Sequence, residues 1–261
     1  MEVIICDSAE EIGGLVADAI ETLVTAKPDC VLGLATGGSP AAIYDELGRR
    51  HRERGLSFAR VCAFMLDEYV GLPADHPERY RTVIEREVVA PLELDPANVH
   101  GPDGLAADLP AACAAYEQAI VDAGGVDLQI LGIGSDGHVA FNEPGSSLAS
   151  RTRIKTLTRQ TRRDNARYFD GDVEAVPRHC ITQGMATIMA ARHLVLVAGG
   201  RGKAEAIHQL VEGPVSAMWP ATLLQVHPHV TVLVDQAAAS RLQLASYFVE
   251  TYAEKPAWQG I

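Results

Sequence analysis

Strand-length apolar runs that alternate with longer helix-like segments are the feature that most restricts how this chain can fold. Parallel strands that are buried on both faces carry continuous runs of this kind, and helices connect them. Six runs fit the pattern: Val3–Cys6, Cys30–Thr36, Val61–Leu66, Leu128–Gly132, Leu194–Ala198 and Val230–Val234. We therefore predict an α/β fold with a doubly wound, mostly parallel sheet flanked by helices, of the Rossmann-like type.

The length favours a single domain over residues 1–261, although a small second lobe stays open. Single α/β domains often reach about 250 residues, and no repeat or linker divides this chain. Ser8 and Glu11 predict a capping box at the first helix, and Ser39-Pro40 predicts a capping hydroxyl with a first-turn proline. Residues 72–77 and 139–176 lack regular patterning, and long irregular segments inside compact domains are usually functional.

Charge and composition argue against several classes of partner. With 22 basic and 34 acidic residues, the formal net charge is −12, and the lysines are scattered. We therefore expect no nucleic-acid partner. No apolar run approaches the ~18 residues of a membrane span, and the start of the chain lacks the basic region of a signal peptide. Five cysteines without a CxxC pair are expected to be reduced, which predicts a cytoplasmic protein without a membrane partner.

Ligands of such sheets bind beyond the carboxyl ends of the strands, so the residues that follow each strand are the candidates. After the second predicted strand, Thr36, Gly37, Gly38 and Ser39 precede a helix N-terminus, whose free N–H groups attract anions. The segment is a candidate phosphate cradle. A tight turn without a ligand is the alternative.

Two adjacent carboxylates, Asp67 and Glu68, follow the third predicted strand. One could serve as a general base, because partial burial would raise its pKa toward working pH. The alternative is that Asp67 caps a turn while Glu68 faces water. A metal site is disfavoured, since no His or Cys lies at ligand spacing beside them.

The segment 132–138, after the fourth predicted strand, contains the pattern G-x-G-x-x-G. We do not expect a dinucleotide site, because that motif should open a helix and the following residues include a proline. The glycines instead predict a tight turn. Asp136, His138 and Glu143 could place two carboxylates around an imidazole that titrates near neutrality, and a structural histidine is the alternative.

The segment 199–203, with the sequence GGRGK, follows the fifth predicted strand and opens a helix. It lacks the spacing of a Walker A loop, and Ala204 stands where that motif has Ser or Thr. Lys203 could still offer a point charge to a phosphate. A solvated first-turn lysine is the alternative.

Around these residues the sequence closely resembles glucosamine-6-phosphate deaminases, members of the glucosamine/galactosamine-6-phosphate isomerase family. These enzymes convert glucosamine 6-phosphate and water to fructose 6-phosphate and ammonium. The resemblance covers nearly the whole chain, and its most specific parts are LGLATGGSP, LDEYVGLP, GIGSDGHVAFNEPGSSLASRTRIKTLT and MWPATLLQVHP. It implies a hydrolase of amino sugar metabolism that acts on a phosphosugar without a redox cofactor or catalytic metal.

The resemblance also implies a role for each candidate residue. Asp67 would move a proton between C2 and C1 of the open-chain sugar. His138 would open the pyranose ring by shuttling a proton to the ring oxygen, with Asp136 and Glu143 orienting it. The substrate-binding residues would be Thr36, Gly37, Gly38, Ser39, Arg167 and Lys203.

Bacterial hexameric members of this family carry an allosteric site for N-acetylglucosamine 6-phosphate at subunit interfaces. The matching residues of this chain are Ser146, Arg153, Lys155, Thr156 and Tyr247. A polar loop beside a helix is the alternative. From chemistry alone, Arg153 and Lys155 at alternate positions could face one anion together. We expect activation by this phosphosugar, a homohexamer, and a mobile lid around residues 157–177.

Two other functions compete with this interpretation. The 6-phosphogluconolactonases resemble this family in fold and share a GxGxDGH-like segment, so lactone hydrolysis is the nearest enzymatic alternative. The residues that follow His138 and the LDEY motif favour the deaminase. A non-catalytic phosphosugar sensor is the alternative from another class, and the presence of all four acid–base candidates argues against it.

Overall fold

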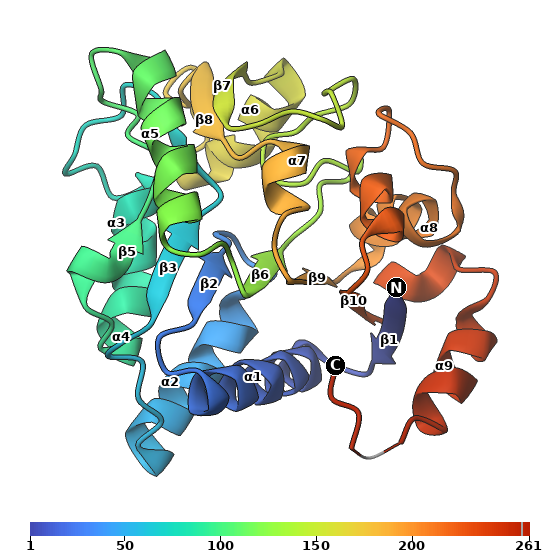
Figure 1. Cartoon of the computed structure of the whole chain (residues 1–261). Coiled ribbons are helices and arrows are strands. Elements are labelled where there is room, and N and C mark those ends of the chain that lie inside the picture. Colours follow the sequence, from blue (N-terminus) through green and yellow to red (C-terminus); the bar gives the residue numbers. More distant parts are fainter. Residues whose placement is uncertain (257) are drawn as a thin grey trace.

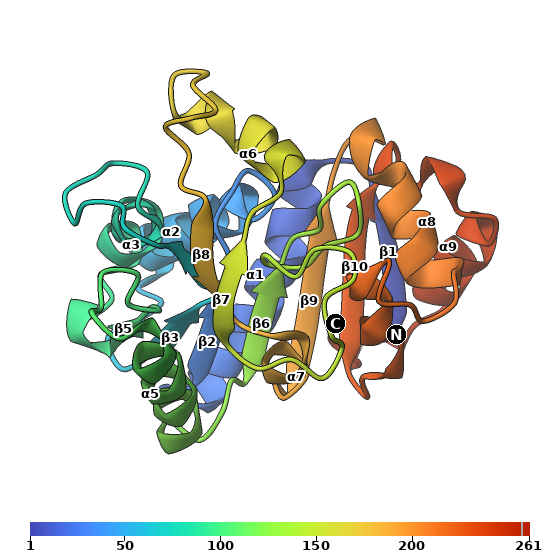
Figure 2. The same cartoon turned by 90° about the horizontal axis from the view of Figure 1, so that it is seen from above.

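The computed structural model describes residues 1–256 and 258–261, and a seven-stranded sheet forms its centre (Figures 1 and 2). Its order is β1-β10-β9-β6-β2-β3-β5, with parallel pairing throughout. The strands are β1 (Glu2–Cys6), β2 (Val31–Leu34), β3 (Cys62–Met65), β5 (Val99–His100), β6 (Leu128–Leu131), β9 (His193–Ala198) and β10 (Val230–Asp235). The predicted α/β fold and its six strands are confirmed. The two-residue β5 is too short to carry a sequence pattern.

Helices cover both faces of this sheet. α1 and α2 pack together on one face, whereas α5 and α7 lie on the other, and α9 lies beside the edge strand β1 (Figures 1 and 2). The α-helices are α1 (Ala9–Ala26), α2 (Ala41–Arg54), α3 (Tyr80–Ile84), α4 (Ala90–Leu92), α5 (Leu109–Asp122), α6 (Arg159–Asn165), α7 (Met185–Ile188), α8 (Ala204–Glu212) and α9 (Ala245–Ala253). The other helical turns are η1 (Glu85–Val89), η2 (Pro96–Asn98), η3 (Ala166–Tyr168), η4 (Arg201–Lys203), η5 (Pro220–Val226) and η6 (Ala238–Arg241).

Burial explains why the central strands are apolar on both faces. In β9 and β10, Val195, Leu196, Val232 and Leu233 are fully buried. A parallel sheet with helices on both faces leaves no solvated side, so its strands show no polar alternation. This core holds the carboxyl ends of the strands in fixed positions.

The helix starts confirm one cap prediction and correct another. The Ser8 hydroxyl accepts the Glu11 N–H at 3.1 Å, and the Glu11 carboxylate accepts the Asp7 N–H at 2.7 Å. The predicted Ser8 cap is therefore present, and Glu11 reaches back to the N–H one residue before the position that it takes in a capping box. The prediction that Ser39 caps α2 is wrong, because Pro40 occupies the cap position without a side-chain hydrogen bond, with φ −82° and ψ −6°.

A second, three-stranded sheet in the order β4-β8-β7 corrects the prediction of an irregular segment at 139–176. Its strands are β4 (Asp67–Tyr69), β7 (Arg153–Thr156) and β8 (His179–Thr182), paired antiparallel. The same segment also contains α6. The strand sequences DEY and RIKT are polar, so their pattern does not resemble that of a buried strand. Residues 72–77 contain neither helix nor strand, as predicted.

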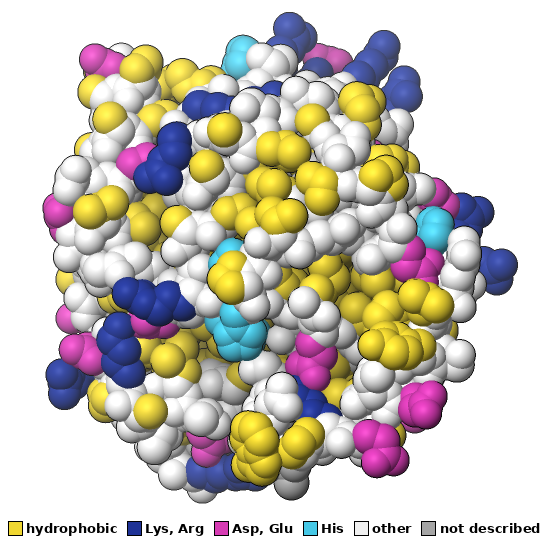
Figure 3. Space-filling view, turned by 45° about the vertical axis from the view of Figure 1, so that its right-hand side comes forward, with side chains coloured by type: hydrophobic (Ala, Val, Ile, Leu, Met, Phe, Trp, Pro, Cys, Tyr) yellow, Lys and Arg dark blue, Asp and Glu magenta, His cyan; other side chains and the backbone are white. Residues whose placement is uncertain are grey.

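The surface in Figure 3 mixes side chains of all kinds, with basic groups set among acidic and hydrophobic ones. In the described residues, no helix is both long and apolar enough to cross a membrane. A smaller apolar cluster, separate from the main core, packs around Tyr69, Phe141 and Phe169. Residues 157–177 contribute Leu157, Ala166, Phe169 and Val176 to this cluster.

Candidate active site

Four of the candidate segments follow four adjacent strands. The sheet places β9, β6, β2 and β3 next to one another, so the loops after them leave from the same edge. With neighbouring strands about 4.8 Å apart, their carboxyl ends span only about 14 Å. The chain proceeds outward from β2 to β3 on one side and from β6 to β9 on the other. The crevice between β2 and β6 is therefore the switch point at which such sheets bind ligands.

Asp67 begins β4, and Leu66 alone separates it from the end of β3. Its side chain is 8% exposed. Burial, and secondarily the negative charge of Glu68, raise the pKa of Asp67 to about 8. Within the described part of the chain, no hydrogen bond to its carboxylate opposes this shift. Such a group can take up and release a proton near neutral pH, as a general base must.

Glu68 is the neighbouring carboxylate, and it is held in a structural role. Its oxygens accept the backbone N–H groups of Tyr69, Tyr80 and Arg81 at 2.8, 3.1 and 2.9 Å, which caps α3. Burial still raises the pKa of Glu68, against the opposing effect of these bonds. The alternative in which Glu68 faces water is wrong, since the residue is 1% exposed. Asp67 therefore remains the candidate base.

The turn after β6 presents His138 beside Asp136. Gly137 adopts φ +79° and donates its N–H to the Gly134 carbonyl at 3.0 Å, so the predicted tight turn is confirmed. A Cβ at Gly134 would collide with the imidazole. Nδ1 of His138 lies 2.7 Å from an Asp136 carboxylate oxygen, a close pair whose N–H is not well aligned. Burial alone would raise the pKa of Asp136, but hydrogen bonds and charge from His138 lower it below its ordinary value.

Glu143 is held by the start of α6 rather than by the imidazole. One of its oxygens accepts the Thr158 N–H at 3.3 Å and the hydroxyls of Thr158 and Thr161 at 3.2 and 2.5 Å. Within the described residues, no hydrogen bond or ion pair joins Glu143 to His138. The structure therefore brings Asp136 against His138 and ties Glu143 to the segment that follows β7.

The segment after β2 is shaped to leave its backbone open. Gly37 has φ +98°, and a Cβ on Gly37 or Gly38 would meet no atom within 4 Å. The Tyr44 hydroxyl accepts the Ala35 N–H at 3.1 Å and donates to the Ala35 carbonyl at 2.8 Å, which fixes the loop to α2. Thr36 and Ser39 complete the segment and are partly exposed. Open backbone before a helix start is the geometry that anions favour.

Two cations lie close together near these loops. Lys203 ends η4, after β9, and Arg167 lies on η3. Burial, followed by the positive charge of Arg167, lowers the pKa of Lys203, while Asp136 and Asp164 act in the opposite direction. The two like charges repel one another without a bound anion. A phosphate between them would relieve that repulsion.

The five residues matched to an activator site fall into two groups. Ser146 is 3% exposed, and among the described residues its hydroxyl has no hydrogen-bond partner. Arg153 and Lys155 lie on one side of β7, as alternate residues do, next to Thr156. Tyr247 is 56% exposed on α9, which lies at the opposite edge of the molecule from β7 (Figures 1 and 2). One chain therefore does not bring all five together.

Sequence reasoning missed several polar residues around Asp67 and Glu143. Asn165 donates its side-chain N–H to the Tyr69 hydroxyl at 2.9 Å, and the Tyr80 hydroxyl donates to the same oxygen at 3.2 Å. Thr158 and Thr161 bind Glu143, as described above. The capping preference of Thr158 was the one available signal, and nothing local indicates the others.

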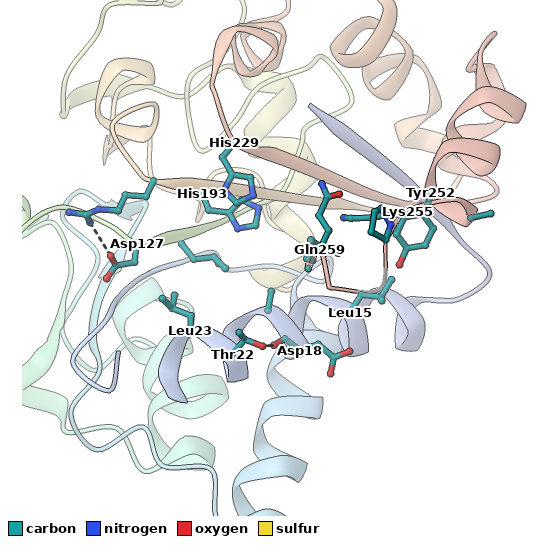
Figure 4. A pocket seen from close by; sticks show the side chains of 17 residues that line it. Leu15, Asp18, Thr22, Leu23, Asp127, His193, His229, Tyr252, Lys255 and Gln259 are labelled. Atoms are coloured by element: carbon teal, nitrogen blue, oxygen red, sulfur yellow. Dashed lines mark hydrogen bonds and ion pairs between the residues drawn. The ribbon is translucent and has the colours of Figure 1, made fainter. Parts of the chain in front are cut away.

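A large cavity lies elsewhere, at the amino ends of the strands. It encloses about 780 Å³ between α1, the starts of β6 and β9, and the C-terminal residues (Figure 4). His193 and His229 stack at its wall, with ring centroids 3.6 Å apart. Asp127 is paired with Arg192 at 3.0 Å. In the described residues, no group of three or more His, Cys, Asp or Glu is arranged to hold a metal ion.

Comparison with known proteins places the chain in a family. Residues 7–233 match the model of the glucosamine-6-phosphate isomerases/6-phosphogluconolactonase family. Proteins named glucosamine-6-phosphate deaminase from Beutenbergia cavernae and Mycolicibacterium smegmatis are 71% and 70% identical, over all of this chain and all of each relative. A solved monomeric glucosamine-6-phosphate deaminase is 42% identical, with TM-score 0.90 over 92% of this chain and 100% of that one. A 6-phosphogluconolactonase from Trypanosoma cruzi, 20% identical with TM-score 0.75 over 93% of this chain and 97% of that one, shares the fold. The chain belongs to the family of glucosamine-6-phosphate isomerases and 6-phosphogluconolactonases.

Proposed function

We propose that this protein is a glucosamine-6-phosphate deaminase, which converts glucosamine 6-phosphate and water to fructose 6-phosphate and ammonium. The observation that carries the proposal is full-length identity of about 70% to relatives of that name. A buried carboxyl group after β3 and an imidazole–carboxylate pair after β6, two strands away in the sheet, supply the acid–base groups that the reaction needs.

Ring opening is the first step that this geometry supports. The pyranose opens when the proton of the C1 hydroxyl leaves and a proton reaches the ring oxygen. His138 can carry that proton, because an imidazole both accepts and donates near neutral pH. The adjacent Asp136 carboxylate stabilises the protonated imidazole and limits its orientation. Glu143, which Thr158 and Thr161 hold in place, contributes a further negative charge.

Proton transfer between C2 and C1 is the second step. Asp67, as carboxylate, removes the proton from C2, and the electron pair of that bond forms the C1–C2 double bond. The π pair of the C1 carbonyl moves to O1, which takes up a proton from solvent and becomes a hydroxyl. The same carboxyl group then returns a proton to C1, where the pair of the C1–C2 double bond accepts it, and the nitrogen lone pair forms the C2–N double bond. Water adds at C2, ammonium departs, and the ketone of fructose 6-phosphate remains.

The phosphate group is proposed to bind at the open segment after β2. Within the described residues, the backbone N–H groups of Gly37, Gly38 and Ser39 donate no backbone hydrogen bond, and a Cβ on either glycine would meet no atom within 4 Å. Thr36 lies beside them. Lys203 and Arg167 add charge-assisted bonds. Since Arg167 belongs to residues 157–177, that lid segment would contribute one of the two cations when it covers the sugar.

Activation by N-acetylglucosamine 6-phosphate and assembly into a homohexamer are further parts of the proposal. Arg153 and Lys155 on one side of β7 suit a phosphate, and Ser146 offers a hydroxyl that has no partner in the described part of the chain. Tyr247 would have to come from a second copy of the chain, which supports an intersubunit site. Light scattering tests the assembly, and a monomeric mass would overturn it. Substrate-saturation curves that do not change when the activator is added would overturn the regulation.

The decisive experiment measures ammonium and fructose 6-phosphate released from glucosamine 6-phosphate by metal-free protein. Equal amounts of both products are expected. Hydrolysis of 6-phosphogluconolactone is assayed in parallel, because the matched family includes lactonases. Lactone hydrolysis without ammonium release would replace the deaminase with the lactonase, and phosphosugar binding without either activity would indicate a sensor.

A further inference from the structure

The lid segment, residues 157–177, is attached to the strand that carries Asp67 by a polar contact inside an otherwise apolar cluster. Asn165, the last residue of α6, donates its side-chain N–H to the Tyr69 hydroxyl at 2.9 Å. Tyr69 is the last residue of β4, which Asp67 begins. Two residues apart on one strand, Asp67 and Tyr69 project to the same face. The contact therefore joins the lid segment to the immediate surroundings of the candidate base.

The environment of this contact is tightly packed. The Tyr69 ring is 2% exposed, lies edge-on to Phe169 of the lid segment with centroids 5.8 Å apart, and packs on Tyr80 at 4.7 Å. The Tyr80 hydroxyl donates to the Tyr69 hydroxyl at 3.2 Å. A phenylalanine at position 69 would keep every one of these ring contacts. The hydroxyl therefore adds something other than packing, namely a partner for the Asn165 amide.

A polar contact suits a segment that opens and closes. An amide and a phenol that separate can both bind water, so breaking the bond has a small net free-energy change. Elsewhere the lid segment is internally braced, since the Arg162 guanidinium donates to the carbonyls of Val173 and Val176 at 2.6 and 3.1 Å. It can therefore move as one piece, with Asn165 as a contact that is remade at each closure.

The position of Arg167 links this contact to phosphate binding. Arg167 follows Asn165 by two residues, on η3, and its charge reaches Lys203. If Asn165 leaves Tyr69, Arg167 withdraws with it, and one of the two cations near the proposed phosphate position is lost. Closure would therefore join phosphate binding and coverage of Asp67 in a single movement.

We propose that Asn165 and Tyr69 are positioning residues that form a latch, which holds the lid segment over Asp67 and keeps water away during proton transfer. Neither residue takes part in bond making. The effect on proton transfer rests on the proposed function, whereas the contact that holds the lid segment in place does not. When it is absent, the proton held by Asp67 exchanges with solvent more often before it is delivered to C1.

The catalytic test uses Tyr69→Phe and Asn165→Ala with glucosamine 6-phosphate deuterated at C2, in ordinary water. We expect each variant to raise KM about threefold to tenfold, the range that loss of one hydrogen bond produces, with a smaller change in kcat. The deuterium retained at C1 of fructose 6-phosphate should fall in both variants. Gln160→Ala on the exposed side of α6 and Tyr252→Phe on α9 are the matched controls. If both latch variants retain as much deuterium at C1 as the wild type and have the same KM, the latch is overturned.

A second measurement needs no activity. Hydrogen–deuterium exchange of the full chain without substrate should show faster exchange of the amides at 159–171 in both latch variants. The double variant should exchange no faster than either single variant, because both changes break the same bond. If the increases in amide exchange add in the double variant, or if exchange does not change, the latch is overturned. This holds even if the wild type retains too little deuterium at C1 for the catalytic comparison. Absence of fructose 6-phosphate from the wild type would remove the proposed function and leave this result interpretable.

Discussion

The two ends of the central sheet treat their charged groups in opposite ways. At the amino end, the buried Asp127 is bound by Lys27 at 2.8 Å, by Arg192 at 3.0 Å and by the Val31 N–H at 2.8 Å. At the carboxyl end, Asp67 is equally buried but has a second acid beside it. The amino end surrounds its aspartate with cations and a donor, whereas Arg79 and the N–H donors at the carboxyl end go to Glu68, 3.7 Å from the Arg79 Nε, and leave Asp67 protonated up to about pH 8.

The same contrast applies to the cations. Lys255 at the amino end lies 2.5 Å from Glu2, whereas burial and the charge of Arg167 lower the pKa of Lys203 at the carboxyl end. Unfavourable electrostatics that persist in a folded protein are typical of functional sites, where a substrate relieves them. The large cavity at the amino end is thus a poorer guide to the reaction than the perturbed groups at the other end.

Replacing one buried aspartate at each end should produce the largest difference. Asp67→Asn is expected to lower kcat about a thousandfold, since general bases contribute typically 10²–10⁴-fold. Asp127→Asn should keep kcat within about twofold, while losing stability because Lys27 and Arg192 lose their partner. The rate of ammonium release per folded molecule measures kcat in both variants, and urea denaturation measures the loss of stability in Asp127→Asn. A similar loss of kcat in the two variants would erase the contrast between the ends.

The pH dependence of stability should distinguish Asp67 from an asparagine at the same position. The pKa of Asp67 is raised to about 8 from 3.8, so between these values the unfolded chain has released a proton that the folded protein still holds. Below about pH 4 the carboxyl group is protonated in both the folded and the unfolded state, and its ionisation then costs no stability. Its contribution to the free energy of unfolding falls by up to about 1.4 kcal/mol per pH unit from pH 4 to 8.

Urea denaturation of wild type and Asp67→Asn at pH 5 and pH 8 checks this expectation. The variant should gain on the wild type as the pH rises, because it has no carboxyl group to ionise. Parallel stabilities at both pH values would indicate that Asp67 carries its charge without penalty.

Removing one cation at each end should have a smaller effect. Lys203→Met is expected to raise KM for glucosamine 6-phosphate about tenfold, through loss of a charge-assisted bond to phosphate. Arg192→Met removes a cation of the amino end and should leave KM unchanged. Initial-rate measurements over a range of substrate concentrations decide the point, and equal effects in the two variants would indicate a general charge effect.

Filling the cavity at the amino end should have the smallest effect. Ala19 on α1 lines it, and Ala19→Phe places an aromatic ring in space of about 780 Å³. We expect kcat and KM within about twofold of wild type, because the four strand ends at the other edge do not change. A larger loss of activity would connect this cavity to the reaction.

The positions of the candidate residues were predictable to different degrees. Asp67, His138 and Lys203 follow apolar runs, so their place at the carboxyl edge could be read directly from the strand pattern. The pairing of Glu143 with Thr158 and Thr161 could not be read in this way. It depends on β7 and α6, whose polar sequences carry no apolar pattern. The cap expected at Ser39 was wrong because α2 begins at Ala41, one residue later than predicted, so Pro40 occupies the cap position.

By itself, the sequence determined the parallel sheet and the side chains at its strand ends, because apolar runs, glycines and caps act over a few residues. Only the tertiary structure decided that, of the two neighbouring acids, Glu68 receives three backbone donors while Asp67 receives none from the residues that the structure describes. The donors to Glu68 include Tyr80 and Arg81, and Asn165 meets Tyr69 across 96 residues. Desolvation and hydrogen bonding between distant segments exist only after the chain has packed, so no local pattern encodes them.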